Sequence, residues 1–341
     1  MTDRREFVDR SELDRAVDEL GAPLRDLALR IHQHPELRFE ERQASSWMAE
    51  LLEGFGPVRV ERAVGGLPTA FRARAGQGEP RIALLAEYDA LPEIGHACGH
   101  NLIAAGAAGA FLALSRFAER LSGSVEIVGT PAEEGGGGKI RLLEAGVFEG
   151  IAAAMMYHPF DRDILAHPAL AGAWVTMRFR GKPAHAAAAP WSGSSALTAC
   201  MQTFHLVDSQ RVHFRDGVRV HGFITNGGQA VNIIPEHAAC EFSVRALSQS
   251  ELDRVLEIVE RCARAAALAC GAHLESDAQR GYRDMRNNMT IARRFGAALR
   301  ALGRTPREVD SGVGSGSTDM GDVSHHIPSI HPYLAICEPG Q

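Results

Sequence analysis

Apolar residues recur at helical spacing in the first part of the chain and at strand spacing after it. In residues 11–33 they lie three or four positions apart: Leu13, Val17, Leu20, Leu24, Leu27 and Ile31. Residues 41–54 repeat this spacing, so the pattern predicts two opening helices. The stretches VRVERAV, TAFRARAG and RIALLAEYD then predict strands. The last is apolar enough to lie at the centre of a sheet that is covered on both faces.

Strands and helices alternate in the stretch that follows. The long apolar helix NLIAAGAAGAFLALSRFAERL precedes the strand SVEIVGTPA and the helix GKIRLLEAGVFEG. This alternation predicts a layered α/β domain around a central mixed sheet. From residue 169 the order becomes strand, helix, strand, strand, helix, strand, which is typical of a ferredoxin-like fold. We therefore expect one domain from residues 1–168 and 282–341, with residues 169–281 inserted into it.

Composition narrows the class of protein. The 341 residues are 45% apolar, the formal net charge is −6, and no basic stripe occurs that could neutralise the phosphates of a nucleic acid. The first twenty residues are charged, and no run of about 18 uncharged apolar residues occurs, so we expect a soluble, cytoplasmic protein without membrane contacts. Six cysteines without CxxC spacing argue against a disulfide framework.

The stretch GHACGHN, residues 95–101, is the first candidate for chemistry. It lies between the predicted central strand and the apolar helix, where open α/β sheets bind ligands. A helix N-terminus and neighbouring cations lower the pKa of a thiol, so we expect Cys98 to be a thiolate near neutral pH. A thiolate with the imidazole of His100 suits zinc and tolerates other divalent metals. The alternative is that these are satisfied side chains of a tight turn.

Two further strand ends carry similar side chains. In GTPAEEGGGGK, one carboxylate of Glu133 and Glu134 can bind a metal while its neighbour acts as a general base. In MMYHPF, His158 closes another apolar strand. A solvated acidic turn and a core histidine are the plainer interpretations of each motif alone. Together, Cys98, His100, Glu134 and His158 could hold two metals about 3.5–4 Å apart.

Several stretches resemble a known family in the same order: IHQHPELRFEE, EYDALPEIGHACGHN, GTPAEEGGGGK, HP, GKPAHAAAAPWSGSSAL, NIIPEHAACEFSVRAL and GSGSTDMGDVSHHIPSIHP. They are similar to the co-catalytic metallopeptidases and amidohydrolases related to aminoacylase and carboxypeptidase G. Within that family the chain resembles the amidohydrolase branch, which includes p-aminobenzoyl-glutamate hydrolase and dipeptidases acting on β-alanyl-lysine-type peptides. The resemblance implies a layered α/β metallo-exopeptidase domain, with residues 169–281 as a lid and dimerisation domain.

The resemblance also implies roles for individual residues. Cys98 would bridge two metals, zinc or alternatively manganese, with His100, Glu134 and His158 as terminal ligands. Glu133 would be the general base, and Asp89 would orient a ligand. His185 would reach across a homodimer interface to stabilise the oxyanion, although it could instead be a strand–helix corner residue. Asn232 and Arg245 would bind the substrate carboxylate, although they could equally be a loop-shaping residue and an exposed strand residue.

Two departures from the family pattern affect the metal site. The family usually has H-x-D-x-x-P where this chain has Glu87, Asp89 and Pro92, so His100 takes the place of the first ligand, or Glu87 coordinates instead. The family also has a histidine ligand and a helix beyond the last strand, whereas this sequence stops at LAICEPGQ. We interpret this as a truncation or a loosely held second metal, with weaker metal retention and reduced turnover. His325, His326 and His331 are expected to be loop and strand-edge residues.

These expectations lead to one main functional hypothesis and two alternatives. The main hypothesis is a dimetal amidohydrolase that cleaves the amide of a small N-acyl amino acid or dipeptide with a free carboxylate. The first alternative is a hydrolase that uses Cys98 as the nucleophile, which would leave Glu134 and His158 without a function. The second is a catalytically silent relative that acts as a binding module.

Overall fold

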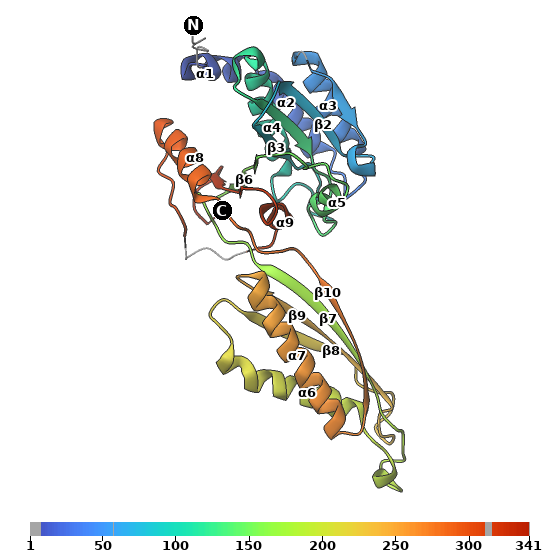
Figure 1. Ribbon diagram of the computed structural model, residues 1–341. Helices are drawn as coiled ribbons and strands as arrows, with labels where there is room; N and C mark the ends of the chain where they lie inside the picture. The colour runs from blue at the N-terminus through green and yellow to red at the C-terminus, as the bar shows by residue number, and fades with distance from the viewer. Residues whose placement is uncertain (1–7, 57, 311–315, 341) are drawn as a thin grey trace. The chain divides into compact units, whose positions relative to one another are not determined.

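The computed structural model describes residues 8–56, 58–310 and 316–340. The chain forms two compact units (Figure 1). Unit 1 consists of Met1–Pro168 and Met285–Gln341, and unit 2 consists of Ala169–Asp284. Each unit has its own cluster of buried apolar residues. Within the described residues, every helix is too short or too polar to cross a membrane.

A six-stranded mixed sheet forms the centre of unit 1. Its strands are β1 (Val60–Arg62), β2 (Phe71–Gly76), β3 (Arg81–Ala86), β4 (Ser124–Gly129), β5 (Ala153–Met155) and β11 (Ser329–Ile330). They are arranged in the order β1-β2-β4-β3-β5-β11. The four strands from β4 to β11 in this order run parallel, and β1 and β2 are antiparallel to their neighbours. The predicted α/β class with a central mixed sheet is therefore confirmed.

Helices cover this sheet and complete unit 1. They are α1 (Arg10–Glu19), α2 (Gly21–Gln33), α3 (Arg42–Phe55), α4 (His100–Ser115), α5 (Gly138–Glu144), α8 (Met289–Ala301) and α9 (Met320–Ser324), with 3-10 turns at Val64–Gly66 and Ala118–Arg120. Ala73, Ile127 and Leu84 are adjacent across β2, β4 and β3, and they pack into the core formed with α1 to α4. Ala83 and Leu85 alternate with Leu84 and are also fully buried. Both faces of β3 are thus covered, which explains its continuous apolar run.

The last part of the chain returns to unit 1 and pairs with earlier strands. β11 lies beside β5, and Leu299 of α8 packs in one buried cluster with Ile330 of β11 and with Leu165. A second, two-stranded parallel sheet joins β6 (His158–Phe160) to β12 (Tyr333–Ala335), with Tyr333 opposite His158. The residues after β11 are consequently held beside His158, although about 170 residues separate them in sequence.

Unit 2 is a four-stranded antiparallel sheet with two helices. Its elements are β7 (Ala171–Arg180), α6 (Ala196–Gln210), β8 (Arg219–Asn226), β9 (His237–Ala246), α7 (Gln249–Ala269) and β10 (His273–Arg280), with 3-10 turns at Pro190–Ser192 and Arg211–His213. The strands are arranged in the order β10-β7-β9-β8. α6 and α7 pack against this sheet around Cys200, Cys240, Phe242 and Val259.

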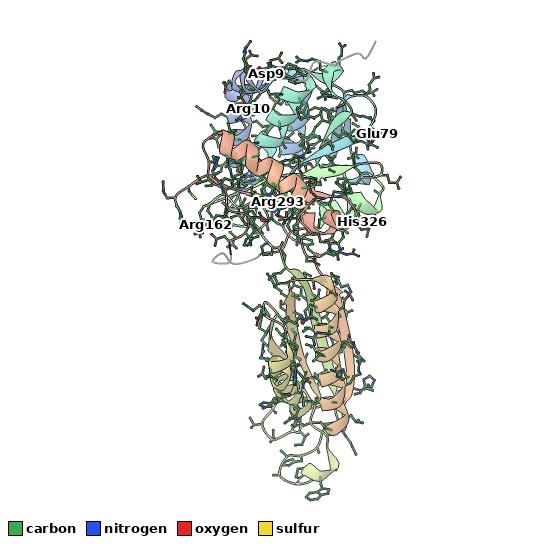
Figure 2. All side chains as sticks on the ribbon, turned by 60° about the vertical axis from the view of Figure 1, so that its left-hand side comes forward. Asp9, Arg10, Glu79, Arg162, Arg293 and His326 are labelled. Atoms are coloured by element: carbon green, nitrogen blue, oxygen red, sulfur yellow. The ribbon has the colours of Figure 1, made fainter. Side chains whose placement is uncertain are left out.

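Charged side chains occupy the outside of unit 1 (Figure 2). Arg293 on α8, for example, pairs with Glu308 at 3.1 Å, and both side chains are more than half exposed. Exposed pairs of this kind contribute about 0–1 kcal/mol each, because water screens them. Other charged side chains of this unit are buried, among them Glu87, Asp89, Lys139 and Asp319.

Candidate metal centre and active site

The candidate residues of unit 1 follow the carboxyl ends of three neighbouring parallel strands. Glu87 and Asp89 follow β3, Glu133 and Glu134 follow β4, and His158 follows β5. Because parallel strands end at the same edge of a sheet, these residues are brought to one place.

Cys98, His100 and Glu134 converge. One potential ligand atom from each lies within 4.8 Å of the others. Gly99, between the first two, has a φ of 73° and precedes α4, so the chain turns sharply there and presents both side chains to the same side. A thiol, an imidazole and a carboxylate from two separate strand ends therefore form one cluster.

Asp89 orients this cluster. Its carboxylate Oδ1 and its main-chain carbonyl oxygen lie 3.1 and 3.0 Å from Nδ1 of His100, and its Oδ2 accepts the N–H of Glu134 at 2.9 Å. Burial opposes protonation of His100, but the hydrogen bond to Asp89 and the charge of Glu87 raise its pKa to about 10. With Nδ1 bonded to Asp89, Nε2 of His100 is the atom that can bind a metal.

His158 lies beside this cluster, and His331 lies beside His158. The ring centroids of His100 and His158 are 5.9 Å apart, and those of His158 and His331 are 5.7 Å apart. Nδ1 of His158 donates to the Pro159 carbonyl oxygen at 2.7 Å, and burial lowers the pKa of this histidine, so Nε2 holds a free electron pair. His100, His158 and His331 therefore lie next to one another at this cluster.

His331 is a loop residue directly after the edge strand β11, as expected, but it is also buried and lies beside His158. Its side chain is 4% exposed, and burial together with His158 lowers its pKa to about 3. His331 directly follows β11, which pairs in parallel with β5, so the strand-end rule that identified His158 could also have identified it. His326 is exposed and His325 is half-buried.

The expectation that Cys98 is a thiolate near neutral pH is wrong for the metal-free chain. Burial raises the pKa of the thiol, as do the hydrogen bond to Glu134 and the charges of Glu133 and Glu87. The carboxylates around Cys98 therefore outweigh the helix N-terminus. A neutral thiol is a poor nucleophile, so this environment weighs against a mechanism in which Cys98 attacks the substrate.

Glu133 is buried next to Glu134. Burial raises its pKa well above the usual range, and the charges of Glu87 and Asp319 raise it further. The preceding residue, Ala132, has a left-handed φ of 58°, and its N–H donates to Oε1 of Glu41 at 2.8 Å. Glu41 also accepts from Phe39 N and the Thr69 hydroxyl. This fully buried carboxylate anchors the backbone before Glu133, a role that its sequence motif does not predict.

Lys139 and Asp319 are two further site residues that were not predicted from the sequence. The ammonium of Lys139 donates to Glu87 at 2.5 Å and to Asp319 at 2.6 Å, and all three side chains are buried. Burial disfavours ionisation of Glu87, but Lys139 and the nearby histidines lower its pKa to about 2. Lys139 could have been noticed because it directly follows the GGGG stretch behind the glutamate pair.

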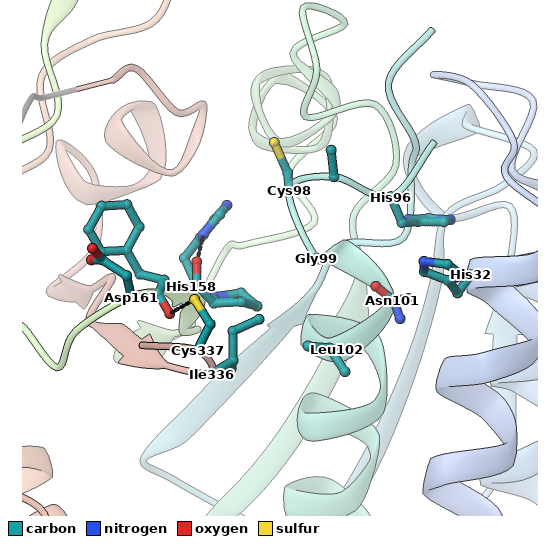
Figure 3. A pocket seen from close by; sticks show the side chains of 13 residues that line it. His32, His96, Cys98, Gly99, Asn101, Leu102, His158, Asp161, Ile336 and Cys337 are labelled. Carbon is teal, nitrogen blue, oxygen red and sulfur yellow. Dashed lines mark hydrogen bonds between the residues drawn. The ribbon is translucent and has the colours of Figure 1, made fainter. Parts of the chain in front are cut away.

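A cavity of about 570 Å³ opens beside the cluster. It is lined by Cys98 and His158, by His32 and His96, and by Ile336 and Cys337 near the end of the chain (Figure 3). His96 is 8% exposed, and neither of its ring nitrogens has a hydrogen-bond partner within the described part of the chain. The cavity is large enough for a small amino-acid derivative.

His185, Asn232 and Arg245 belong to unit 2. His185 is exposed, and its Nδ1 accepts the N–H groups of Ala187 and Ala188. Its loop pairs with the Asn232 loop, because Ala186 N donates to the Asn232 carbonyl oxygen at 2.9 Å. Arg245 lies eight residues beyond His237 along β9, roughly 26 Å for an extended strand. Within one chain, therefore, Arg245 and Asn232 do not converge on the same carboxylate.

The cluster in unit 1 fits a divalent metal. Nε2 of His100, Oε2 of Glu87 and Nε2 of His331 are buried without a hydrogen-bond partner among the residues described. Buried polar atoms nearly always have a hydrogen bond, and here His100 Nε2 and Glu87 Oε2 face each other only as an ion pair at 3.5 Å, so three such atoms in one cluster point to a missing ligand. Thiolate, imidazole and carboxylate are the ligands that zinc and related divalent metals take in proteins.

Comparison with known families and proteins agrees with this chemistry. Residues 83–341 match the model of peptidase family M20/M25/M40. The chain is 40% identical over 342 residues to Xaa-Arg dipeptidase from Mus musculus, covering 95% of this chain and 78% of that protein. It is 34% identical over 317 residues to one of the p-aminobenzoyl-glutamate hydrolase polypeptides of Escherichia coli, covering 85% of this chain and 65% of that protein.

Solved structures share the fold. A putative aminohydrolase from methicillin-resistant Staphylococcus aureus superposes with a TM-score of 0.87 at 19% identity, covering 98% of this chain and 92% of the other. A dinuclear metal-binding peptidase from Bacillus subtilis superposes with a TM-score of 0.76 at 22% identity, covering 96% and 89% of the two chains. At these identities the likeness establishes the architecture alone.

Proposed function

This chain belongs to peptidase family M20/M25/M40, and on that premise we propose that it hydrolyses the amide bond of a small N-acyl amino acid or dipeptide with a free carboxylate. The observation that carries the proposal is the convergence of Cys98, His100 and Glu134 within 4.8 Å, with His158 beside them. This is a metal-ligand set next to a spare buried acid, Glu133.

The names of the relatives support this substrate class. Xaa-Arg dipeptidase and p-aminobenzoyl-glutamate hydrolase are both named for small substrates that end in an amino acid. The cavity of about 570 Å³ beside Cys98 and His158 is of a size for such molecules and too small for a folded protein.

We assign Cys98, His100, Glu134 and His158 as ligands of two divalent metals. Zinc is the first choice, because the set contains a thiolate and two imidazoles, and manganese is the alternative. When bound, such cations polarise the amide carbonyl and make water a stronger nucleophile at neutral pH. Asp89 holds the His100 ring and the Glu134 backbone, so it positions two of the four ligands.

Glu133 is the proposed general base. A carboxylate next to a ligand glutamate can take the proton from the attacking water and pass it to the leaving amine nitrogen. Burial and the charges of Glu87 and Asp319 raise the pKa of Glu133, which favours its holding the proton between these two steps. Burial of Glu133 keeps bulk water from competing for that proton.

Unit 2 is the proposed ferredoxin-like lid and dimerisation domain. In this assignment His185 donates a hydrogen bond to the oxyanion, while Asn232 and Arg245 bind the substrate carboxylate. Arg245 lies far along β9 from the Asn232 loop, which supports a site that draws these residues from two copies of the chain. A homodimer formed through unit 2 would supply Asn232 from one copy and Arg245 from the other.

The test compares Glu133→Gln with Glu134→Gln. We expect Glu133→Gln to retain its metal and to lose about 10²–10⁴-fold in kcat, because the amide cannot accept the proton. The matched Glu134→Gln variant should lose metal, since a ligand is removed. Metal content by mass spectrometry and hydrolysis of a panel of N-acyl amino acids and dipeptides provide the readouts. Full activity of the Glu133→Gln variant would remove the proposed base.

A further inference from the structure

Lys139 lies at the centre of three buried carboxylates. Its ammonium donates to Oε1 of Glu87 and to Oδ1 of Asp319, and its backbone N–H donates to Oδ2 of Asp319 at 3.0 Å. Carboxylate oxygens of Glu87, Asp319 and Glu133 lie within 4.8 Å of one another, which is close enough to hold a metal ion. The cation found among them is instead a side chain of the protein.

The cation in this cluster is a lysine, a residue that is rare in this chain. Only two of its 36 basic residues are lysines, Lys139 and Lys182, and the rest are arginines. A lysine ammonium is a compact point charge with three donors, whereas a guanidinium is a planar fork. Lys139, Glu87 and Asp319 are all fully buried, so the ammonium and its two carboxylate partners are shielded from bulk water.

The contacts of Lys139 join three parts of unit 1. Glu87 follows β3, Lys139 is in the first turn of α5, and Asp319 precedes α9, 180 residues further along the chain. With Oε1 of Glu87 bonded to Lys139, Oε2 of the same carboxylate lies 3.5 Å from Nε2 of His100 and has no hydrogen-bond partner among the residues described. Lys139 thus determines which oxygen of Glu87 faces the ligand cluster.

We infer that Lys139 is a built-in counter-cation, whose ammonium occupies the place of a metal ion among Glu87, Glu133 and Asp319. It is a positioning residue: it confines metal ions to the side of Cys98, His100, Glu134 and His158, and it holds Glu87 with Oε2 toward His100. The inference rests on the proposed metal centre and adds to it. Without the ammonium, three close carboxylates would form an oxygen-ligand site suited to a hard cation such as Mn²⁺.

Metal stoichiometry of Lys139→Met tests this inference. Methionine fills the volume of the lysine side chain without its charge. After equilibration with Mn²⁺ and removal of free ion, we expect the variant to hold about one more equivalent of Mn²⁺ per chain than the wild type. We also expect added Mn²⁺ to raise its Tm more than that of the wild type. A merely structural lysine would produce neither effect.

Two further variants serve as controls. Lys182→Met removes the only other lysine and should leave the Mn²⁺ count at the wild-type value. The double variant Lys139→Met, Asp319→Asn removes a carboxylate as well as the ammonium, and should lose the extra equivalent. An unchanged Mn²⁺ count in folded Lys139→Met would overturn the inference.

Asp319→Asn alone covers the case in which Lys139→Met does not fold. If Lys139 is the cation of this cluster, Asp319→Asn should keep the wild-type metal content, because Asp319 then binds the lysine and no metal. Loss of one metal equivalent would show that Asp319 is a ligand and would refute the inference. Since these readouts count metal ions, they are independent of whether Glu133→Gln abolishes hydrolysis.

Discussion

Near neutral pH in the metal-free chain, Cys98 is a neutral thiol and His100 is an imidazolium cation. Burial and the surrounding carboxylates raise the pKa of the thiol, and the hydrogen bond to Asp89 helps to raise that of His100 to about 10. A metal ligand must be a thiolate or a neutral imidazole. Metal binding to this cluster is therefore coupled to the loss of both protons.

We predict that metal binding releases about two protons per chain near pH 7. Because both pKa values are raised, the protons compete with the metal throughout the neutral range, and the apparent affinity should increase by up to about 100-fold per pH unit below both pKa values. Isothermal titration calorimetry in buffers of different ionisation enthalpy measures the number released. Heats that do not depend on the buffer would contradict the assignment of Cys98 and His100 as ligands.

At the scale of elements, the loop from β4 to α5 positions Glu133 and Glu134. Gly138, the first residue of α5, passes so close to the loop that an added Cβ would lie 1.8 Å from the Pro131 carbonyl oxygen. The Pro131 oxygen belongs to the backbone, so it cannot move aside easily to make room for a Cβ at position 138. The glycine at this position allows the chain to double back directly behind the two glutamates.

We expect Gly138→Ala to destabilise the protein by about 1–3 kcal/mol, as other overpacking substitutions do, and to weaken metal binding through displacement of Glu134. The matched control is Gly54→Ala in α3, where an added Cβ meets no atom within 4 Å. That change should be neutral or stabilising by up to about 1 kcal/mol, because alanine favours helix. Chemical denaturation and metal titration of both variants test this. Equal stability and equal metal affinity of the two variants would show that the loop before α5 tolerates displacement.

At the scale of the whole molecule, the two units have separate cores, and every candidate metal ligand lies in unit 1. The ends of unit 2 are held together by hydrogen bonds of Gly172 N to Tyr282 O and of Gly281 N to Gly172 O. A segment whose two ends are hydrogen-bonded to each other loses few stabilising contacts when it is excised from the chain.

We therefore predict that residues 169–284 fold alone and unfold cooperatively, with a Tm that EDTA does not change. In the full chain, EDTA should lower the transition of unit 1 only, because binding stabilises the unit that holds the ligand. Differential scanning calorimetry of the segment and of the full chain, with and without EDTA, provides the measurement. A segment without a cooperative transition would show that unit 2 depends on unit 1.

Much of the fold and part of the site could be predicted from sequence because the signals are local. Apolar periodicity indicated the buried strand before Glu87 and the helix after Gly99, and parallel strands have a common edge where ligands bind. These rules are sufficient to predict that Cys98, His100, Glu134 and His158 lie near one another. The roles of Glu133, His185, Asn232 and Arg245 stay predictions until they are tested.

Tertiary structure alone decided the electrostatics of the site. Lys139, Asp319 and Glu41 carry no local signal of the groups they bind: the bonds of Lys139 to Glu87 and Asp319, and of Ala132 to Glu41, join residues 52 to 180 positions apart in sequence. The protonation of Cys98 likewise depends on carboxylates that reach it from other strand ends, which is why the local helix rule predicted the wrong direction. Side-chain chemistry and periodicity are properties of the sequence, whereas the field at a buried atom depends on distances that only the folded chain defines.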